Sequence, residues 1–129
     1  MRWACVLVAV LAVAGCNGGT VDRHALTNDA ATLDSINCEA WLLSGAVARR
    51  RVTEAYAREQ AHALRVQAAN FADALRRRPA ATGLEPRVRA KAREAAALAA
   101  RLRRLQTHPT DRVAADSLSA RFKRAGGCS

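Results

Sequence analysis

The sequence predicts an all-α protein, in which a long antiparallel helical hairpin with coiled-coil-like packing is followed by a short third helix. Alanine and arginine dominate the 129 residues, and both are strong helix formers. Apolar residues recur at alternating intervals of three and four positions along two long stretches, a spacing that keeps one stripe facing a partner helix. Glycine and proline fall mostly in short clusters that mark turns. We therefore expect helices at about 28–78, 84–107 and 110–125, within one domain at 28–129.

A targeting segment precedes this domain. The apolar run at 4–14 is too short to span a bilayer but fits the apolar region of a signal peptide. It ends in Val13-Ala14-Gly15-Cys16, which resembles the lipobox of bacterial lipoproteins: an aliphatic residue, two small residues and then a cysteine. The resemblance implies that residues 1–15 are a signal peptide removed before Cys16, and that the Cys16 thiol carries a diacylglycerol. An ordinary secretory signal peptide, or an uncleaved buried helix, is the alternative interpretation.

Residues 16–27 are expected to form a flexible, lipid-anchored tether, because they begin with the small polar run Asn17-Gly18-Gly19-Thr20. Two or three acyl chains on one cysteine would hold such a protein stably on a membrane. Asn17 stands where the inner-membrane retention signal of some Gram-negative lipoproteins carries aspartate. By that resemblance we expect a bacterial cell-envelope protein, on the outer membrane and facing the periplasm if the host is Gram-negative.

The first long helix, expected at 28–78, carries two apolar stripes. The first stripe is interrupted only by Arg50 and Glu54, and it comprises Leu33, Ile36, Ala40, Leu43, Val47, Ala57, Ala61, Leu64, Ala68, Phe71 and Leu75. The second stripe lies almost opposite, and it comprises Cys38, Trp41, Gly45, Ala48, Val52 and Ala55. This helix should end near Arg78, because Pro79 cannot donate the hydrogen bond that would continue it.

The second helix repeats the pattern of the first stripe. Its apolar positions are Leu84, Val88, Ala95, Leu98, Leu102 and Leu105, interrupted only by Lys91. Thr82 and Glu85 have the spacing of a capping box, although Pro86 could instead be the first helical residue. A break at 107–110 separates this helix from the third, which Gly126 and Gly127 terminate.

The third helix has two possible packing partners. It can cross toward the second stripe, which would leave Leu33, Ile36, Leu43 and Val47 partly uncovered. An uncovered apolar stripe of that length usually marks an interface, so another copy or an envelope protein would dock there. In the alternative arrangement, the third helix simply covers the first stripe.

The resemblance to lipoproteins also bears on the cysteines. If Cys5 is lost with the signal peptide and Cys16 carries lipid, only Cys38 and Cys128 remain, in a compartment that usually permits disulfides. Each arm of the expected hairpin has roughly forty residues, or about 60 Å of helix, so both cysteines would lie at the same end. We expect a disulfide between them.

Charged residues are distributed unevenly along the chain. Residues 17–48 contain one basic and four acidic side chains, whereas residues 49–129 contain nineteen basic and seven acidic ones. A basic body of this kind favours anionic lipids or envelope polymers. The candidate anion-binding residues are Arg49, Arg50, Arg51, Arg76, Arg77, Arg78, Arg101, Arg103 and Arg104. Solvated helix faces in an arginine-rich composition are the alternative explanation, and the isolated Trp41 and Tyr56 argue against single-stranded nucleic acid as the partner.

The sequence offers little for catalysis or metal binding. Glu59 and His62 have the Glu-x-x-His spacing of di-iron helical bundles, but the facing residues at 100–104 of the expected hairpin include no carboxylate. We therefore expect no metal, no cofactor and no enzymatic activity. The predicted function is that of a lipid-anchored envelope scaffold or interaction module. A binder of anionic lipids or envelope polyanions, and a periplasmic holdase-like chaperone, are the alternatives.

Overall fold

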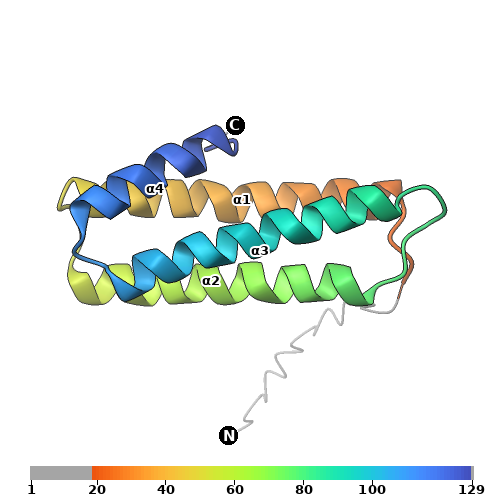
Figure 1. The fold of residues 1–129 in the computed structure, drawn as a ribbon, viewed down its shortest axis with the longest axis horizontal. Helices are drawn as coiled ribbons and strands as arrows, with labels where there is room; N and C mark the ends of the chain where they lie inside the picture. Colours follow the sequence, from red (N-terminus) through yellow and green to blue (C-terminus); the bar gives the residue numbers. More distant parts are fainter. Residues whose placement is uncertain (1–18, 129) are drawn as a thin grey trace, which may run out of the picture.

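The computed structural model describes residues 19–128, and over this range the chain is helical, as the sequence predicts. Four helices follow one another: α1 at Arg23–Ala48, α2 at Glu54–Arg77, α3 at Glu85–Thr107 and α4 at Arg112–Arg124. The first three lie side by side along the long axis of the molecule, and α4 lies along one half of α1 (Figure 1). The signal peptide expected at 1–15, and Cys16, lie outside the described residues.

The single helix expected at 28–78 is wrong, because the chain reverses between α1 and α2. At the end of α1 the amides of Arg50 and Arg51 bond back to the Val47 and Ala46 carbonyls, at 3.1 and 2.9 Å, in the pattern of a Schellman motif. Arg50 adopts the left-handed conformation that this motif requires, with φ at 54°. Thr53 then begins α2 by accepting a hydrogen bond from the Tyr56 amide. The described chain thus forms four helices joined by three reversing turns, rather than one long hairpin followed by a short third helix.

Replacing Arg50 with glycine should stabilise the protein by about 1 kcal/mol, because a side chain in the left-handed region is strained and glycine is not. The matched control is Arg51→Gly, since Arg51 is also exposed but does not have a positive φ. There glycine should lower stability by roughly 0.5–1 kcal/mol through unfolded-state entropy. Denaturant unfolding of both variants measures the difference, and equal shifts in the two would contradict this interpretation.

The other helix boundaries lie close to those expected, but the start of α3 is capped differently from the prediction. α3 begins at Glu85 with Pro86 in its first turn, and Leu84 caps it without a side-chain hydrogen bond. The capping box from Thr82 does not form, because the Glu85 carboxylate instead accepts a hydrogen bond from the Gly83 amide at 2.9 Å. α4 begins at Arg112, two residues later than expected, and the Asp111 side chain caps it.

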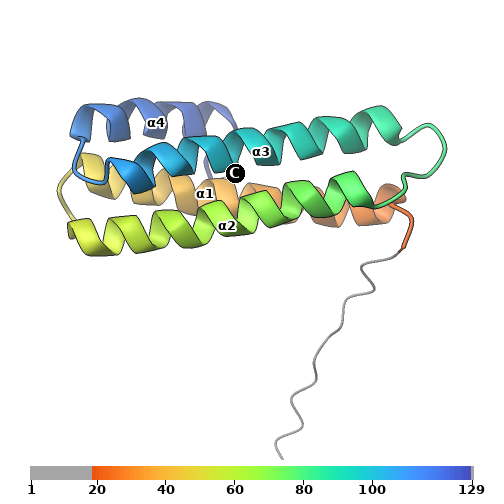
Figure 2. The same ribbon diagram turned by 60° about the horizontal axis from the view of Figure 1, so that its bottom comes forward.

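The core is built mostly from alanine and leucine. The most extensive helix contact joins α2 and α3, which face one another through short side chains, so that their backbones approach closely. The buried residues of these two helices are Ala57, Ala61, Leu64, Ala68, Ala72 and Leu75 in α2, and Val88, Ala92, Ala95, Leu98, Leu102 and Leu105 in α3. α4 packs on α1 through its own buried face, Ala115, Leu118 and Phe122 (Figure 2).

The interface predicted on the first stripe of α1 is also wrong. Leu33, Ile36, Leu43 and Val47 are 5–7% exposed and belong to the main core of this chain. The reason is the reversal after α1: it lets α2, α3 and α4 all pack against that helix, so that one chain covers the whole stripe. These residues therefore do not form the exposed stripe on which the predicted interface depends.

The flexible tether expected at 16–27 is wrong from Val21 onward, because residues 21–27 belong to the helical bundle. Helix α1 begins at Arg23, where Asp22 caps it by accepting a hydrogen bond from the Ala25 amide at 2.8 Å. Val21 is fully buried against the turn between α2 and α3. A tether between Cys16 and the bundle could therefore include only residues that precede Val21.

Candidate functional site

The chain enters the bundle beside the α2–α3 turn, which we call the entry end. The Val21 amide donates to the Pro79 carbonyl at 2.8 Å, and the Ala81 amide donates to the Val21 carbonyl at 2.9 Å. Arg78 secures the same segment, because its guanidinium lies 3.4 Å from both the Gly19 carbonyl and an Asp29 carboxylate oxygen. The Arg78 and Asp29 side chains are only 20% and 18% exposed. Their ion pair is therefore screened less by salt than the exposed pairs of this chain.

A groove of about 500 Å³ opens at the entry end, between the start of α1 and the start of α3. Arg23, His24 and Arg87 line it, together with Asp22 and the residues of the α2–α3 turn. Asp22 is engaged in capping α1. The groove therefore offers cationic side chains that suit an oxyanion of a ligand.

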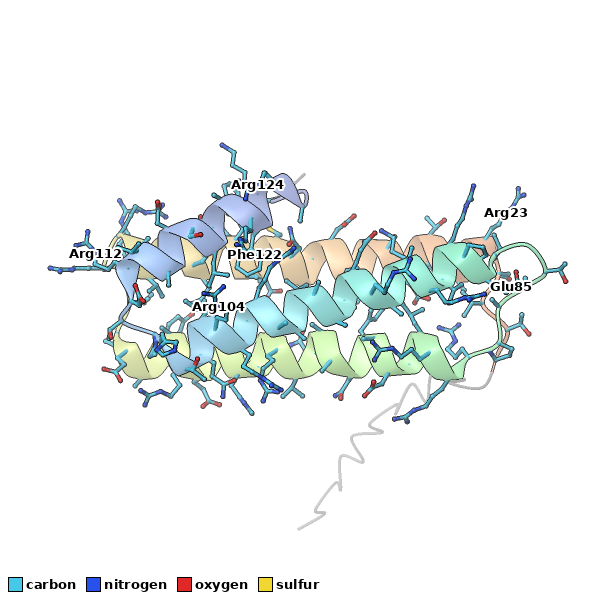
Figure 3. All side chains as sticks on the ribbon, viewed as in Figure 1. Arg23, Glu85, Arg104, Arg112, Phe122 and Arg124 are labelled. Carbon is cyan, nitrogen blue, oxygen red and sulfur yellow. A yellow bond between two sulfur atoms is a disulfide. The ribbon has the colours of Figure 1, made fainter. Side chains whose placement is uncertain are left out.

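The structure divides the predicted anion-binding residues between the two ends of the bundle. Arg76, Arg77 and Arg78 lie at the entry end, whereas Arg49, Arg50 and Arg51 lie in the α1–α2 turn at the opposite end. Arg101, Arg103 and Arg104 lie in the last two turns of α3, toward that opposite end. Figure 3 marks the separation, with Arg23 and Glu85 at one end and Arg112 at the other. The nine arginines do not form one patch.

Several of these arginines have structural partners. Arg76 pairs with Asp73 at 3.3 Å on the surface of α2. The guanidinium of Arg49 lies over Gly45, where an added Cβ would approach it to 3.2 Å. Arg112, which the sequence did not single out, donates from Nε to the Ala48 carbonyl at 3.1 Å and so helps to cap α1. The side chains of Arg49 and Arg112 thus contact the C-terminal end of α1, which makes them less available to a ligand.

Cys38 and Cys128 are joined as a disulfide, with Cα atoms 4.5 Å apart. The pair lies near the middle of α1 rather than at the end of an arm, because α4 runs antiparallel to α1 and covers only half of it (Figure 1). Asn37 reinforces the contact: it is 6% exposed, and its side-chain amide donates to the Phe122 carbonyl at 3.0 Å. This side-chain anchor, next to the cysteine, was not predicted from the sequence.

An apolar groove of about 310 Å³ lies between α1 and α2, lined mainly by Leu42, Leu43, Val52, Tyr56 and Leu64. Leu42 and Tyr56 stand out because they are 55% and 52% exposed, although both are large and apolar. Neither belongs to the two predicted stripes of its helix, so the periodicity gave no signal for them. Glu39 is the one charged residue in the lining.

Of the Glu59-x-x-His62 pattern, His62 takes part in a side-chain hydrogen-bond network between α2 and α3. The Nδ1 atom of His62 lies 3.2 Å from both Gln106 and Arg65, and Arg65 also donates to the Gln106 side-chain oxygen at 2.8 Å. Among residues 19–128, no group of three histidine, cysteine or acidic side chains is placed to hold a metal ion. Within the same range, no helix is both long and apolar enough to cross a membrane.

Comparison with protein-family models, with curated proteins and with solved structures finds no match for this chain.

Proposed function

We propose that the chain is a lipid-anchored protein of the bacterial cell envelope, whose helical domain serves as a non-enzymatic scaffold or interaction module. The observation that carries this proposal is the position of Cys16. It ends a run that resembles a lipoprotein signal, and it stands only five residues before Val21, which is buried in the bundle. A diacylglycerol on Cys16 would therefore hold a compact domain directly at a membrane surface.

The pairing of Cys38 with Cys128 fits this location, because disulfides persist mainly in exported proteins. The surface fits a scaffold rather than a catalyst. A further groove, of about 420 Å³, lies between the middle parts of α1 and α3, and two of its charged side chains form an ion pair, with Lys91 Nζ 2.9 Å from Glu94. The exposed apolar groove beside Leu42 and Tyr56 offers the kind of surface through which scaffolds make contacts.

Binding to anionic surfaces is the second candidate function. The observation that favours it is the set of exposed arginines outside the ion pairs of the described residues, which include Arg23, Arg77, Arg87 and Arg89. The two functions are compatible, since an anchored scaffold gains from further contacts with the lipid surface.

Replacing Cys16 with serine should abolish both signal-peptide cleavage and acylation, because serine has no thiol to receive the diacylglycerol. Intact mass of the protein extracted from membranes is the measurement. The wild-type chain should start at Cys16 and carry added acyl mass, whereas the variant should retain residues 1–15. Cys5→Ser is the matched control and should be processed normally. A wild-type protein that starts elsewhere, without acyl mass, would contradict the proposal.

A further inference from the structure

The position of the entry end restricts how the domain can sit on a membrane. Arg78 donates a hydrogen bond to the Gly19 carbonyl. Both the amide and the carbonyl of Val21 are hydrogen-bonded to residues of the α2–α3 turn. Only Asn17 and Gly18 separate Cys16 from Gly19. The three steps from the Cα atom of Cys16 to that of Gly19 can therefore span at most about 11 Å. If Cys16 carries lipid, as the proposed function requires, the entry end must lie close to the membrane surface.

Charge alone does not select an end of the bundle, because arginines lie at both. The link to Cys16 does select one. α2 has 24 residues, so the α1–α2 turn lies about 36 Å along the bundle from the entry end. The electrostatic attraction of a membrane surface fades within about 8 Å at physiological ionic strength. Side chains at the entry end can lie within that distance, whereas those at the opposite end of an upright bundle cannot.

The exposed cationic side chains at the entry end come from all three neighbouring helices. Arg23 begins α1, Arg77 ends α2, and Arg87 and Arg89 lie in the first turns of α3. A second groove of about 390 Å³ at this end is lined by Leu75, Arg76, Arg78, Ala80, Glu85, Val88, Arg89 and Ala92, so that it holds three arginines and one carboxylate.

The acidic side chains of this end are already engaged with the protein. Asp22 and Glu85 accept hydrogen bonds from the Ala25 and Gly83 amides. Asp29 and Asp73 pair with Arg78 and Arg76. The remaining arginines are therefore free to bind phosphate oxygens, for which the guanidinium group is well suited.

We propose that the entry end is the membrane-docking surface of the protein, and that Arg77, Arg87 and Arg89 bind the phosphates of anionic lipid headgroups beside the anchored Cys16. The bundle then stands on the membrane with its α2–α3 turn at the lipid. The α1–α2 turn and the apolar groove beside Leu42 and Tyr56 point away from it, toward other envelope components.

The test uses the full lipidated protein in vesicles whose headgroups carry a fluorescence quencher. Thr82→Cys in the α2–α3 turn and Thr110→Cys in the turn before α4 form a matched pair, because both threonines are exposed and lie at opposite ends. In anionic vesicles a fluorophore at position 82 should be quenched strongly and one at position 110 only weakly. In neutral vesicles the quenching at position 82 should decrease, because the lipid anchor then acts alone.

The arginines are tested in the same assay. Replacing Arg77, Arg87 and Arg89 together with glutamine should lower the ratio of docked to undocked molecules in anionic vesicles by roughly fivefold for each arginine. The control triple is Arg51, Arg103 and Arg104, which are also exposed but belong to the opposite end, and the change there should be less than twofold.

The outcomes separate the two proposals. Equal quenching at both positions, stronger quenching at position 110, or equal effects of the two arginine triples would overturn the docking surface while leaving the lipid anchor intact. A chain that carries no acyl mass at Cys16 and is not retained by neutral vesicles would overturn the proposed function, and the docking surface with it.

Discussion

Replacing Cys38 with serine is expected to lower the free energy of unfolding by about 2–4 kcal/mol. The disulfide closes a loop of 90 residues, so its loss returns much conformational freedom to the unfolded chain. It also ties the end of α4 to the middle of α1, where α4 is otherwise held by one buried face. The measurement is denaturant unfolding of the variant and of the wild-type protein, both without reductant.

Two controls make this result specific. Glu39→Ser changes an exposed neighbour of Cys38 and should alter stability by less than about 0.5 kcal/mol. A reductant should destabilise the wild-type protein to the level of Cys38→Ser and leave that variant unchanged. If peptide mapping without reductant finds both thiols free, or linked between two chains, the closed bundle described here would be wrong.

The disulfide was predicted correctly, but the structure does not support one of its grounds, the matched lengths of the two hairpin arms. The prediction placed Cys38 at the free end of a helix running from 28 to 78. In the structure that stretch is broken, and Cys38 lies in the interior of α1. Cys128 reaches it because α4 turns back along α1 and because Gly126 and Gly127 adopt positive φ angles after the helix. The pairing followed from the count of available cysteines rather than from the arm lengths.

The turn between α1 and α2 could not be read from residue preferences. Arg49, Arg50 and Arg51 are good helix formers, and neither glycine nor proline is present between Ala48 and Glu54. The two helices face the same core, so the apolar spacing continues across the break as if there were one helix. The weak signals were the polar Arg50 and Glu54 in the apolar stripe and the β-branched Val52 and Thr53.

Helices whose ends are marked by proline or glycine in the sequence were predicted well. Pro79 and Gly83 mark the α2–α3 turn, and α3 spans Glu85–Thr107 where 84–107 was expected. The entry end was missed because its central contact is nonlocal: Val21 is a lone apolar residue in a polar segment, and its partners lie at Pro79–Ala81. The arginine clusters were recognised, but their separation into two ends depends on how the helices fold back.

Replacing Phe122 with alanine is expected to lower the free energy of unfolding by about 3–5 kcal/mol. Phe122 is fully buried, and it is the largest of the fully buried side chains among residues 19–128. Most of the remaining core is alanine and leucine, which leaves few neighbouring side chains large enough to fill the cavity. α4 has only 13 residues, too few to remain helical in water without its packing on α1.

The matched control is Val113→Ala in the same helix, where the side chain is 82% exposed and the change should be within about 0.5 kcal/mol. Hydrogen exchange locates the effect. In Phe122→Ala the amides of α4 should lose protection before those of α2 and α3, because the α2–α3 contact involves no residue of α4. The Asn37 side chain should also lose its acceptor, since the Phe122 carbonyl moves away with the helix. A variant as stable as Val113→Ala, with α4 still protected, would show that this helix is not held to α1 by its aromatic side chain.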